Sequence, residues 1–590
     1  MSEEILEKRQ YTMTDMQIVK RLMTYTIPFL KDFVIVLILM VITVAISVLE
    51  PVLIGVSIDT LTGDDIDLDK LIVLLSIFIT VILVGALFNY LQTILLQVTG
   101  QKIIYNIREE IFTHLEYQDI AYVNNVPIGS LVTRVTNDTN TLNEMYTSVI
   151  VSVFKNVLML FGIIIAMMIL NYKLTLLILI VIPFIVVASF VFRKYSRKQY
   201  RITRGYLSRV NAFLAENLSG MKIIQVFNQE EEKFKEFDEK NTLLKEAYYK
   251  QILIFGIYRP TMYFLYMVTT IIVLYFGGVS VIDGVMTIGF LIAFQHYIGR
   301  FFEPIQQLAE QFNILQSAFA SSERIFGILD SEFTIKDADD AIELDDVKGE
   351  IEFKNVSFAY VDEEWILKDV SFKVKAKESI AFVGATGAGK TTILSLISRN
   401  YDIQKGQILI DGIDITKIKK SSLRSFIGQM LQDVFMFSGT IESNIKLRNK
   451  DISDEQMIKA CKYVNADRFI EKLPKQYQEV VRERGNNFST GQRQLLSFAR
   501  TIVHEPKIMI LDEATSNIDT ETEQLIQESL SKMMSIGTML IVAHRLSTIQ
   551  HVDKIIVLSK GEIIEQGTHQ ELLKNKGHYF NLYKLQYQEK

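Results

Sequence analysis

The chain has 590 residues and a formal net charge of −6, and 49% of its residues are hydrophobic. This length is too great for a single core, so two or more domains are expected. The mild acidity, without a basic tract, excludes a nucleic-acid-binding protein by charge, and the single cysteine, Cys461, excludes an internal disulfide. A mean hydropathy of +0.22 is high for a soluble protein and indicates membrane segments.

The N-terminal segment, 1–27, is predicted to form an amphipathic elbow. From Asp15 to Ile27, apolar side chains recur at helical spacing, with Lys20 and Arg21 between them. A helix of this kind lies on the inner leaflet of a membrane. Pro28 would then turn the chain into the membrane.

Long apolar runs alternate with charged stretches up to about Ile314, and six of them are long enough to cross a bilayer. The predicted spans are Phe33–Gly55, Leu71–Leu96, Val149–Leu170, Leu174–Phe192, Thr261–Ile282 and Val285–Phe302. Lys and Arg gather before the first span, after the second and after the fourth, so these segments and both termini are predicted to be cytoplasmic.

The segments after the second and fourth spans keep helical apolar spacing and are too long to be simple loops. Membrane helices are therefore expected to continue into the cytoplasm and to turn there, at Glu116–Asn125 and Thr203–Val210. Such turns would present a surface to another domain. Solvated helical hairpins are the alternative, which explains less because Tyr117 and Ile120 would lie at exposed tips.

A few polar residues interrupt the predicted spans, and such residues are functional candidates because lipid exposure is costly. Glu50 has two open interpretations: it lines a translocation cavity, or it reaches the outer headgroups. Lys155 and Arg300 are expected to extend to the inner interface. His296, near Gln295, is interpreted as a packed or cavity-lining side chain, because no second metal ligand lies at helical spacing.

The strongest motif is Gly384–Thr392, which matches the phosphate-binding pattern Gly-x-x-x-x-Gly-Lys-Ser/Thr at every fixed position. Ser379–Val383 before it is predicted to be a buried strand, and Thr391–Ile397 after it a helix. Glycines allow successive backbone N–H groups to point at a phosphate, and the N-terminus of the helix adds attraction.

Within this loop, Lys390 is predicted to reach the β- and γ-phosphates, and the Thr391 hydroxyl to ligate Mg²⁺. The positions predicted to bind the nucleotide are Gly384, Thr386, Gly387, Gly389, Lys390, Thr391 and Thr392.

A second nucleotide signal is the apolar strand Ile508–Leu511, which ends in Asp512 and Glu513. Asp512 is predicted to hold Mg²⁺, and Glu513 to polarise a water molecule for attack on the γ-phosphate. Two unrelated surface carboxylates would leave the phosphate loop without its metal and water contacts.

From Glu352 to about Lys584 the chain resembles the nucleotide-binding domain of ABC transporters, and the membrane half resembles the exporter class at Tyr122–Arg134 and Glu216–Gln229. The motif positions that match are Tyr360 for adenine stacking, Gln432 of the glutamine loop, Ser489, Gly491 and Gln492 of the signature motif, Asp519 of the D-loop, and His544 as the switch histidine.

The resemblance implies that two such domains close head to tail around two ATP molecules with Mg²⁺. Ser489 and Gly491 of one domain would contact the γ-phosphate bound by the other. His544 would bond the γ-phosphate of its own site, and Gln432 would link Mg²⁺ to the membrane-facing side. The chain would then be half of a dimeric exporter of amphiphilic drugs or lipids in a bacterial cytoplasmic membrane. A non-pumping ATP-gated channel or regulator is the rival interpretation, disfavoured by the presence of Glu513 and His544.

One departure from the family pattern bears on the partner. Thr490 replaces the usual glycine of the signature and Phe488 the usual leucine, while Lys390, Glu513 and His544 are present. A β-branched residue disfavours φ > 0 and adds bulk near ATP. In heterodimeric bacterial exporters the half with intact catalytic residues often carries such an altered signature. This favours a non-identical partner with a degenerate ATP site; a homodimer is the alternative.

The predicted architecture is therefore an α-helical membrane domain fused to an α/β P-loop NTPase domain of ABC type. The predicted domains are the elbow 1–27, a six-helix transmembrane domain 28–329 with cytoplasmic coupling turns, an acidic linker 330–348, and a nucleotide-binding domain 349–590.

Overall fold

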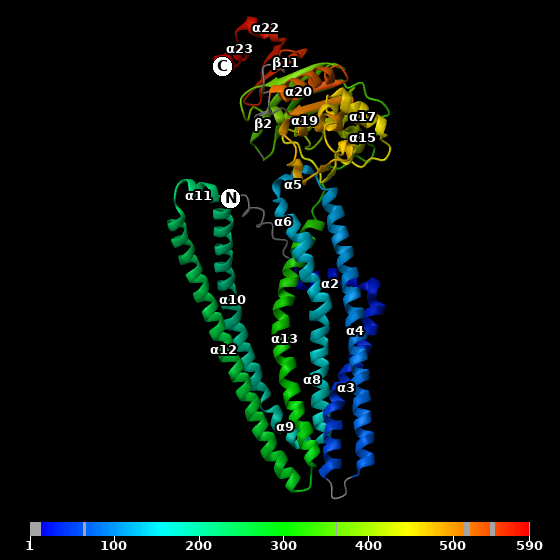
Figure 1. The fold of residues 1–590 in the computed structure, drawn as a ribbon, viewed down its shortest axis with the longest axis vertical. Coiled ribbons are helices and arrows are strands. Elements are labelled where there is room, and N and C mark those ends of the chain that lie inside the picture. The colour runs from blue at the N-terminus through cyan, green and yellow to red at the C-terminus, as the bar shows by residue number, and fades with distance from the viewer. Residues whose placement is uncertain (1–12, 63–66, 362, 513–519, 543–548, 589–590) are drawn as a thin grey trace. The chain divides into compact units, whose positions relative to one another are not determined.

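A computed structural model describes residues 13–62, 67–361, 363–512, 520–542 and 549–588. The chain forms two compact units (Figure 1). One comprises Met1–Tyr117 and Pro127–Ser331, and the other comprises Gln118–Val126 and Glu332–Lys590. The predicted membrane domain included residues 118–126, whereas the structure groups them with the second unit. The other predicted boundaries, at 27 and 348, stay predictions.

The first unit is entirely helical in its described part, as expected for a chain that must satisfy its backbone hydrogen bonds inside a membrane. Its helices are α2 (Asp15–Thr26), α3 (Leu30–Thr62), α4 (Leu68–Glu116), α6 (Ile128–Thr133), α7 (Thr139–Glu144), α8 (Ile150–Leu170), α9 (Tyr172–Leu179), α10 (Ile182–Ser219), α11 (Met221–Val226), α12 (Glu230–Ile282) and α13 (Ile288–Leu329).

Five described helical stretches are long and apolar enough to cross a membrane. They are Asp15–Thr62, Leu68–Glu116, Ile128–Leu170, Tyr172–Ser219 and Glu230–Ile282. The sixth predicted span, Val285–Phe302, lies mostly in α13, where Gln295, His296 and Arg300 interrupt the apolar run. The count of six spans therefore stays a prediction.

The elbow is a helix, as predicted. Thr14 caps α2 through a reciprocal capping box with Gln17. Ile18 and Leu22 are buried in a cluster with residues of α4 and α13, whereas Met16 is 76% exposed. The helix therefore has one packed side and one apolar exposed side, which is the amphipathic arrangement expected from the sequence.

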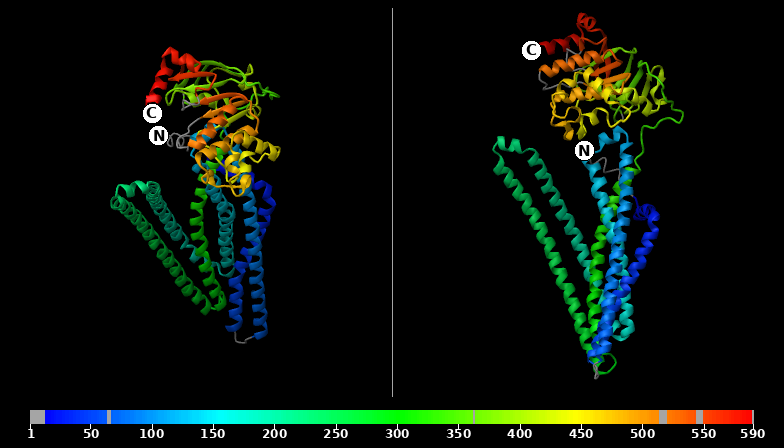
Figure 2. Two further views of the ribbon diagram at one scale, coloured as in Figure 1. Left: turned by 45° about the horizontal axis from the view of Figure 1, so that its top comes forward. Right: turned by 45° about the vertical axis from the view of Figure 1, so that its right-hand side comes forward.

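The first predicted cytoplasmic turn is present, because α4 ends at Glu116 and the short helix α5 (Ile120–Asn125) follows. The second prediction is wrong. Thr203–Val210 lies inside α10, and the chain turns instead around α11, near Asn228 with φ 49°. Gly205, the only glycine in the predicted turn, has no positive φ, so nothing interrupts the helix there. α10 and α12 consequently run beside each other along most of their length (Figure 2).

The second unit contains two main sheets. A six-stranded sheet has the order β12-β11-β3-β10-β9-β6, and a four-stranded sheet has the order β2-β1-β4-β5. The strands are β1 (Ile351–Ala359), β2 (Trp365–Val374), β3 (Ser379–Val383), β4 (Lys405–Ile410), β5 (Ile413–Asp414), β6 (Ile427–Met430), β7 (Gly439–Thr440), β8 (Val480–Val481), β9 (Ile508–Asp512), β10 (Thr538–Val542), β11 (Lys554–Ser559) and β12 (Glu562–Gly567).

The strand predictions before the phosphate loop and before Asp512 are confirmed by β3 and β9. Residues 351–353 and 356–358 alternate in sequence like edge strands, but they do not form an edge of the sheet. They form one irregular strand, β1, between β2 and β4. Alternation of buried and exposed residues reports one covered face of a sheet and does not distinguish an edge strand from an inner one.

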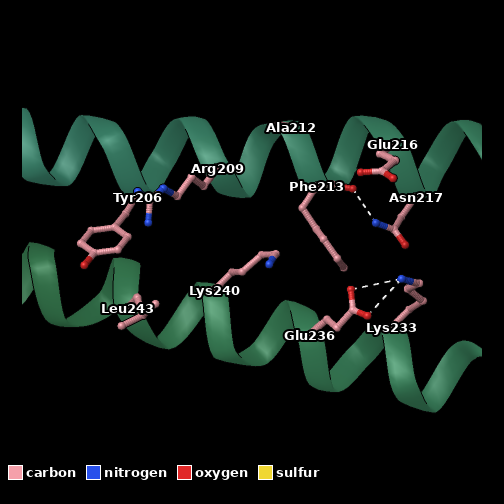
Figure 3. Close-up of a pocket in the computed structure, with 10 residues that line it drawn as sticks. All are labelled: Tyr206, Arg209, Ala212, Phe213, Glu216, Asn217, Lys233, Glu236, Lys240 and Leu243. Carbon is pink, nitrogen blue, oxygen red and sulfur yellow. Dashed lines mark hydrogen bonds and ion pairs between the residues drawn. The ribbon is translucent and has the colours of Figure 1, made fainter.

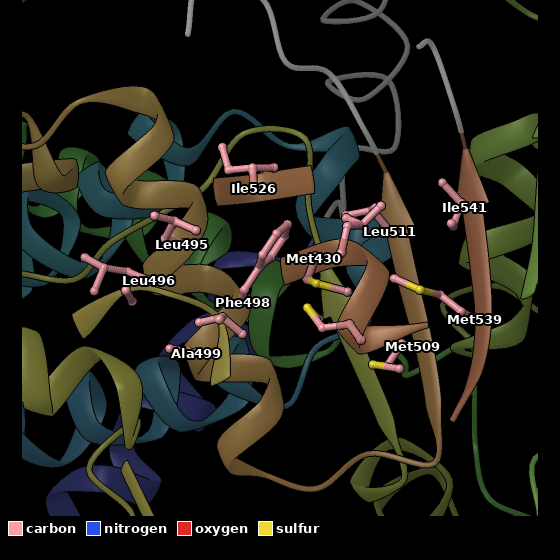
Figure 4. Close-up of a cluster of buried hydrophobic side chains, with 14 of the residues drawn as sticks. Met430, Leu495, Leu496, Phe498, Ala499, Met509, Leu511, Ile526, Met539 and Ile541 are labelled. Atoms are coloured by element: carbon pink, nitrogen blue, oxygen red, sulfur yellow. The ribbon is translucent and has the colours of Figure 1, made fainter. Parts of the chain in front are cut away.

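Helices cover these sheets in the second unit. They are α14 (Lys390–Ile397), α15 (Lys420–Ser425), α16 (Ile441–Ile445), α17 (Asp454–Tyr463), α18 (Asp467–Ile470), α19 (Thr490–Val503), α20 (Thr520–Met533), α22 (His569–Asn575) and α23 (His578–Gln588). The packing of α19 against the sheet is visible in Figure 4, where Leu495 and Phe498 meet Met430 and Leu511. Each such side chain contributes about 1.5–3 kcal/mol through burial.

Candidate ATP site

Parallel strands bring the predicted phosphate loop and the predicted metal ligand to one edge of the six-stranded sheet. Phe382 in β3, Val542 in β10 and Asp512 in β9 lie in register across three neighbouring strands. Gln432 follows β6, which pairs in parallel with β9. All these strands end in the same direction, so the loop, Asp512 and Gln432 emerge at the same edge.

The phosphate loop has the backbone that its glycines allow. Gly387 has φ 81° and Gly389 φ 101°. A Cβ atom at Gly389 would lie 2.6 Å from Leu367 Cδ2, so a larger residue would be strained and crowded there. Lys390 is the first residue of α14, and its Nζ donates to the carbonyl oxygens of Gly384 at 2.8 Å and Ala385 at 3.0 Å.

The electrostatics of the loop suit an anion. Burial lowers the pKa of Lys390, and the nearby Asp512 carboxylate opposes that shift. Thr386, Gly387 and Thr391 are exposed. The loop therefore presents accessible backbone and hydroxyl groups beside a lysine and a helix N-terminus.

The predicted oxygen ligands for Mg²⁺ come from different parts of the edge: the Thr391 hydroxyl, the Asp512 carboxylate and the Gln432 amide. Among the described residues, no group of three His, Cys, Asp or Glu side chains could hold a metal by itself. This donor set fits Mg²⁺, which prefers oxygen and usually binds through few protein groups together with phosphates and water.

Tyr360 stands beside the loop. Its hydroxyl lies 3.2 Å from the Thr392 hydroxyl, and its ring packs edge-on against Tyr401 at 5.0 Å and against Phe358 at 4.8 Å. Burial raises the pKa of Tyr360. The side chain is still 50% exposed, so its ring is fixed by neighbours and retains surface for stacking.

The signature residues form the N-terminus of α19. Ser489 caps this helix, and the Ser489 and Gln492 side chains bond reciprocally to each other's backbone. Phe488 is buried in the core and contacts Phe469. In the described part of the chain, no recorded hydrogen bond or ion pair joins residues 489–492 to the phosphate loop.

Thr490 does not have the unusual backbone that the family glycine suggested. Thr490 is the first residue of α19 and is not among the described residues with positive φ, so no glycine is required by the backbone. Its exposed side chain accepts a hydrogen bond from Arg493 at 3.3 Å. The threonine side chain is still larger than the glycine of the family signature, and this departure lies at the N-terminus of α19. Phe488 is explained as a packing residue.

Three predicted site residues, Glu513, Asp519 and His544, lie outside the described residues. The strands before two of them are described. β9 ends at Asp512, and β10 ends at Val542 in register with it. β9 and β10 therefore end beside each other at the site edge.

Sequence reasoning missed how α5 is held in the second unit. Asn124 of α5 donates from Nδ2 to the Tyr401 hydroxyl at 3.2 Å, and Tyr401 touches Tyr360. Tyr401 belongs to no motif, so only the fold connects it to the predicted adenine platform. Tyr117 and Ile120, at the start of this turn, remain exposed.

Asp119, next to α5, is the anchor of this contact. Its Oδ2 accepts from the backbone N–H groups of Thr334 at 2.6 Å and Ile335 at 3.0 Å. Lys420 Nζ lies 3.6 Å from its Oδ1. Burial opposes ionisation of Asp119, but the bonds from Ile335 and Thr334 and the charge of Lys420 outweigh it and lower its pKa.

Residues 334–337, which include the segment that Asp119 binds, also form hydrogen bonds with Arg399 and Lys420. Arg399, which follows α14, is 2% exposed and donates to the Lys336 carbonyl at 3.1 Å. The Asp337 carboxylate accepts from the Lys420 backbone N–H at 3.0 Å. Residues 334–337 therefore connect α5 to the end of the helix that begins at Lys390.

In the first unit, Glu50 and Arg300 form an ion pair between α3 and α13. Arg300 also donates to the Ser47 carbonyl. Arg300 was expected to reach the inner interface, and its side chain is instead directed to α3. A carboxylate paired with a guanidinium is not free to act as the outer headgroup contact that was one interpretation of Glu50.

The architecture and the edge site define a membrane-embedded P-loop ATPase. Residues 33–305 match the family model of the ABC transporter transmembrane region, and residues 367–516 match the model named ABC transporter. The chain belongs to the ABC transporter family, with both domains fused in one chain as in exporter half-transporters. It is an ATP hydrolase coupled to transport, and it is a multi-pass membrane protein.

Relatives cover nearly the whole chain. YknV of Bacillus subtilis (strain 168), described as an uncharacterized ABC transporter ATP-binding protein, is 38% identical over 99% of this chain and 96% of its own. YheH of the same organism, a probable multidrug resistance ABC transporter ATP-binding/permease protein, is 38% identical over 88% and 77%. An ATP-dependent lipid A-core flippase of Syntrophus aciditrophicus (strain SB) is 34% identical over 97% and 95%.

Proposed function

We propose that this protein exports amphiphilic drugs or lipids across a bacterial cytoplasmic membrane, with both termini and the ATP site in the cytoplasm. The observation that carries the proposal is that α5, which lies between helices of the membrane unit in the chain, is bound beside the predicted adenine platform. The names of the relatives include both multidrug resistance and lipid A-core flippase, which supports an amphiphilic substrate.

The ATP site works through groups at the sheet edge. Lys390 and the loop N–H groups bind the β- and γ-phosphates. Thr391, Asp512 and Gln432 hold Mg²⁺, which neutralises phosphate charge when bound. Glu513 orients the attacking water and accepts its proton, and His544 bonds the γ-phosphate. Tyr360 stacks on adenine. The motifs support all of these roles, and the positions of Lys390, Asp512 and Tyr360 give further support to theirs.

Each ATP site is completed by the signature motif of a second chain. Ser489 and the N-terminal N–H groups of α19, including Gly491, form a phosphate contact at a helix N-terminus. This arrangement is supported by the capping of α19 by Ser489, which leaves Thr490 exposed at the surface of its own unit. ATP then bridges two chains, and hydrolysis removes the bridging charge.

The second chain is a non-identical half-transporter with a degenerate ATP site. The remaining support is the side-chain bulk of Thr490, where the family has glycine, beside an otherwise complete set of catalytic residues. The test is to purify this chain alone and together with a half-transporter encoded next to it, and to measure ATPase activity and oligomeric state. High activity only in the mixed complex is expected. A stable, fully active homodimer contradicts the non-identical partner and leaves the symmetric exporter.

Coupling between ATP and the membrane passes through α5. Adenine stacking on Tyr360 restrains the ring that packs against Tyr401, and Tyr401 holds Asn124. Asp119 and residues 334–337 add a second connection, through Arg399, to the helix after the phosphate loop. Closure of the ATP site therefore moves α5 together with the nucleotide-binding unit.

The substrate path is proposed to include an apolar cavity of about 560 Å³ in the first unit. It is lined by residues of α3 and α8 and by Tyr297 of α13, and Glu50 is not among them. Such a lining suits acyl chains or aromatic drugs. Reconstituted vesicles should accumulate a fluorescent amphiphile or a labelled lipid only with ATP. Uptake that is equal without ATP would contradict active export and favour a channel.

A further inference from the structure

One face of α10 carries a dense stripe of basic side chains. Six Lys or Arg residues occur within twelve positions, and α10 contains no Asp or Glu before Glu216. The stripe, called here the α10 basic stripe, comprises Arg193, Lys194, Arg197, Lys198, Arg201 and Arg204. It begins directly after the apolar part of the helix that ends near Phe192.

The α10 basic stripe points away from the neighbouring helix α12. The buried side of α10 includes Gln199 and Thr203, and Gln199 Nε2 donates to the Ala247 carbonyl of α12 at 2.9 Å. At about 100° per residue, Arg197, Arg201 and Arg204 lie on the opposite side of α10. Five of its six side chains are accordingly exposed: Lys194, Arg197, Lys198, Arg201 and Arg204.

The stripe also forms a groove of about 620 Å³ without a carboxylate in its lining. Its lining residues are Phe190, Arg193, Lys194, Arg197, Lys198, Arg201 and Ile202. Apolar side chains therefore stand at both ends of a basic surface. The ion pairs within α12 join Lys233 to Glu236 and Lys235 to Glu232. In the described part of the chain, no ion pair involves Lys194, Arg197 or Arg201.

A second cavity on the same helix pair shows the contrast. It has about 440 Å³ and lies between α10 and α12 (Figure 3). Its basic residues, Arg209, Lys233 and Lys240, are accompanied by Glu216 and Glu236. Lys233 is bonded to Glu236 at 3.1 Å. Two carboxylates offset most of the basic charge in that cavity, whereas the lining of the α10 groove contains no carboxylate.

We propose that the α10 basic stripe binds the phosphate headgroups of anionic phospholipids in the cytoplasmic leaflet. Clustered Lys and Arg just outside a membrane helix attract such lipids, and Phe190, at the membrane end of the groove, supplies an apolar contact for an acyl chain. The proposal rests on the proposed orientation of the chain. Membrane topology alone requires an excess of Lys and Arg on one side. That rule does not require the basic residues to share one face of a helix. Nor does it require them to extend over about 16 Å along the helix, when the headgroup layer is only about 6 Å thick.

The test compares lipid binding by the purified complex. Native mass spectrometry gives the affinity for phosphatidylglycerol and for phosphatidylcholine in wild type and in the triple variant Arg197→Gln, Lys198→Gln, Arg201→Gln. The matched control removes the same charge from exposed positions of the other unit, with Lys417→Gln, Lys459→Gln and Lys462→Gln. A second stripe variant, Arg197→Lys with Arg201→Lys, keeps the charge. ATPase activity in the same preparations tests the proposed function separately.

The stripe variant should bind phosphatidylglycerol on the order of 100-fold more weakly at low salt, since each basic residue contributes about fivefold near an anionic headgroup. The control and the lysine variant should stay within about twofold of wild type. Equal affinity for the two lipids in wild type, or equal loss in the control, overturns the proposal even where ATPase activity is normal. A stripe variant that changes the dimer content and leaves lipid affinity unchanged also overturns it, because the face would then bind an acidic protein surface.

Discussion

Two regions of the nucleotide-binding unit differ in whether sequence motifs identify them. The sheet edge with Lys390 and Asp512 is built from motif residues that follow parallel strands. The place where α5 is held is built from Asp119, Asn124 and Tyr401, which belong to no motif. The first region holds groups for the chemistry of ATP. The second ties that chemistry to a segment of the membrane part of the chain.

In the proposed mechanism, chemistry and coupling use separate residues, with one shared side chain. Tyr360 contacts Thr392 of the phosphate loop on one side and Tyr401 on the other. Changes at the edge should therefore abolish hydrolysis. Changes around α5 should leave hydrolysis largely intact and reduce the transport obtained from it.

The largest effect is expected from Glu513→Gln. The amide cannot accept the proton of the attacking water, so steady-state ATPase activity should fall by about 10²–10⁴-fold. ATP binding, measured with a fluorescent analogue, should remain because Lys390 and the loop are unchanged. Near-normal ATPase activity would remove Glu513 from its assigned role and blur the distinction between the two regions.

Asp119→Asn should affect coupling and stability together. The variant loses the charge that accepts the bonds of residues 334 and 335 and that lies beside Lys420. A loss of about 1–3 kcal/mol in the free energy of unfolding of the nucleotide-binding unit is expected, measured by denaturant titration. Asp411→Asn, at a carboxylate that also accepts backbone N–H bonds in this unit, serves as a control. It should lower stability and leave the ratio of transport to ATPase activity unchanged.

The sign of the pH dependence follows from the lowered pKa of Asp119. Its contribution is fully present above the ordinary Asp pKa and is lost as pH falls through the lowered folded-state pKa. Wild type should therefore lose stability in that acidic range more steeply than Asp119→Asn. Parallel pH profiles for the two proteins would show that the carboxylate charge does not hold the segment.

A smaller effect is expected from Thr490→Gly. The threonine already has a helical backbone, so glycine relieves no strain and removes only side-chain bulk. In a mixed complex with a degenerate partner, ATPase activity should stay within about twofold, because the partner's site lacks its base. A large rise in activity would show that the site completed by Thr490 hydrolyses ATP, which contradicts a degenerate ATP site in the partner.

Much of the sheet edge with Lys390 and Asp512 could be predicted from sequence, because its functional groups occur at fixed spacing after apolar strands. The phosphate loop, β3 and β9 are where the motifs predict them. Long apolar helices were equally clear. The turn near α11 was misplaced, because helical periodicity continues through Thr203–Val210 and carries no signal for where the helix ends.

The α5 contacts could not be predicted, because they join residues far apart in the chain. Asn124 and Tyr401 are separated by 277 positions, and neither lies at a spacing that indicates a contact. The expectation of a special backbone at Thr490 was wrong for a different reason. The family glycine suggested a special backbone, whereas the capped start of α19 has ordinary helical geometry that any residue adopts.

The most direct test of coupling through α5 is the ratio of transport to ATP hydrolysis in Tyr401→Phe, measured in reconstituted vesicles. This change removes the hydroxyl that accepts from Asn124 and keeps the ring against Tyr360. Tyr463→Phe, which removes a hydroxyl bonded elsewhere in the unit, is the control. We expect ATP affinity and basal ATPase activity within about twofold of wild type, since one neutral hydrogen bond is worth about 1 kcal/mol, and a ratio reduced severalfold only in Tyr401→Phe. An unchanged ratio, or an equal fall in both variants, would contradict coupling through Tyr401.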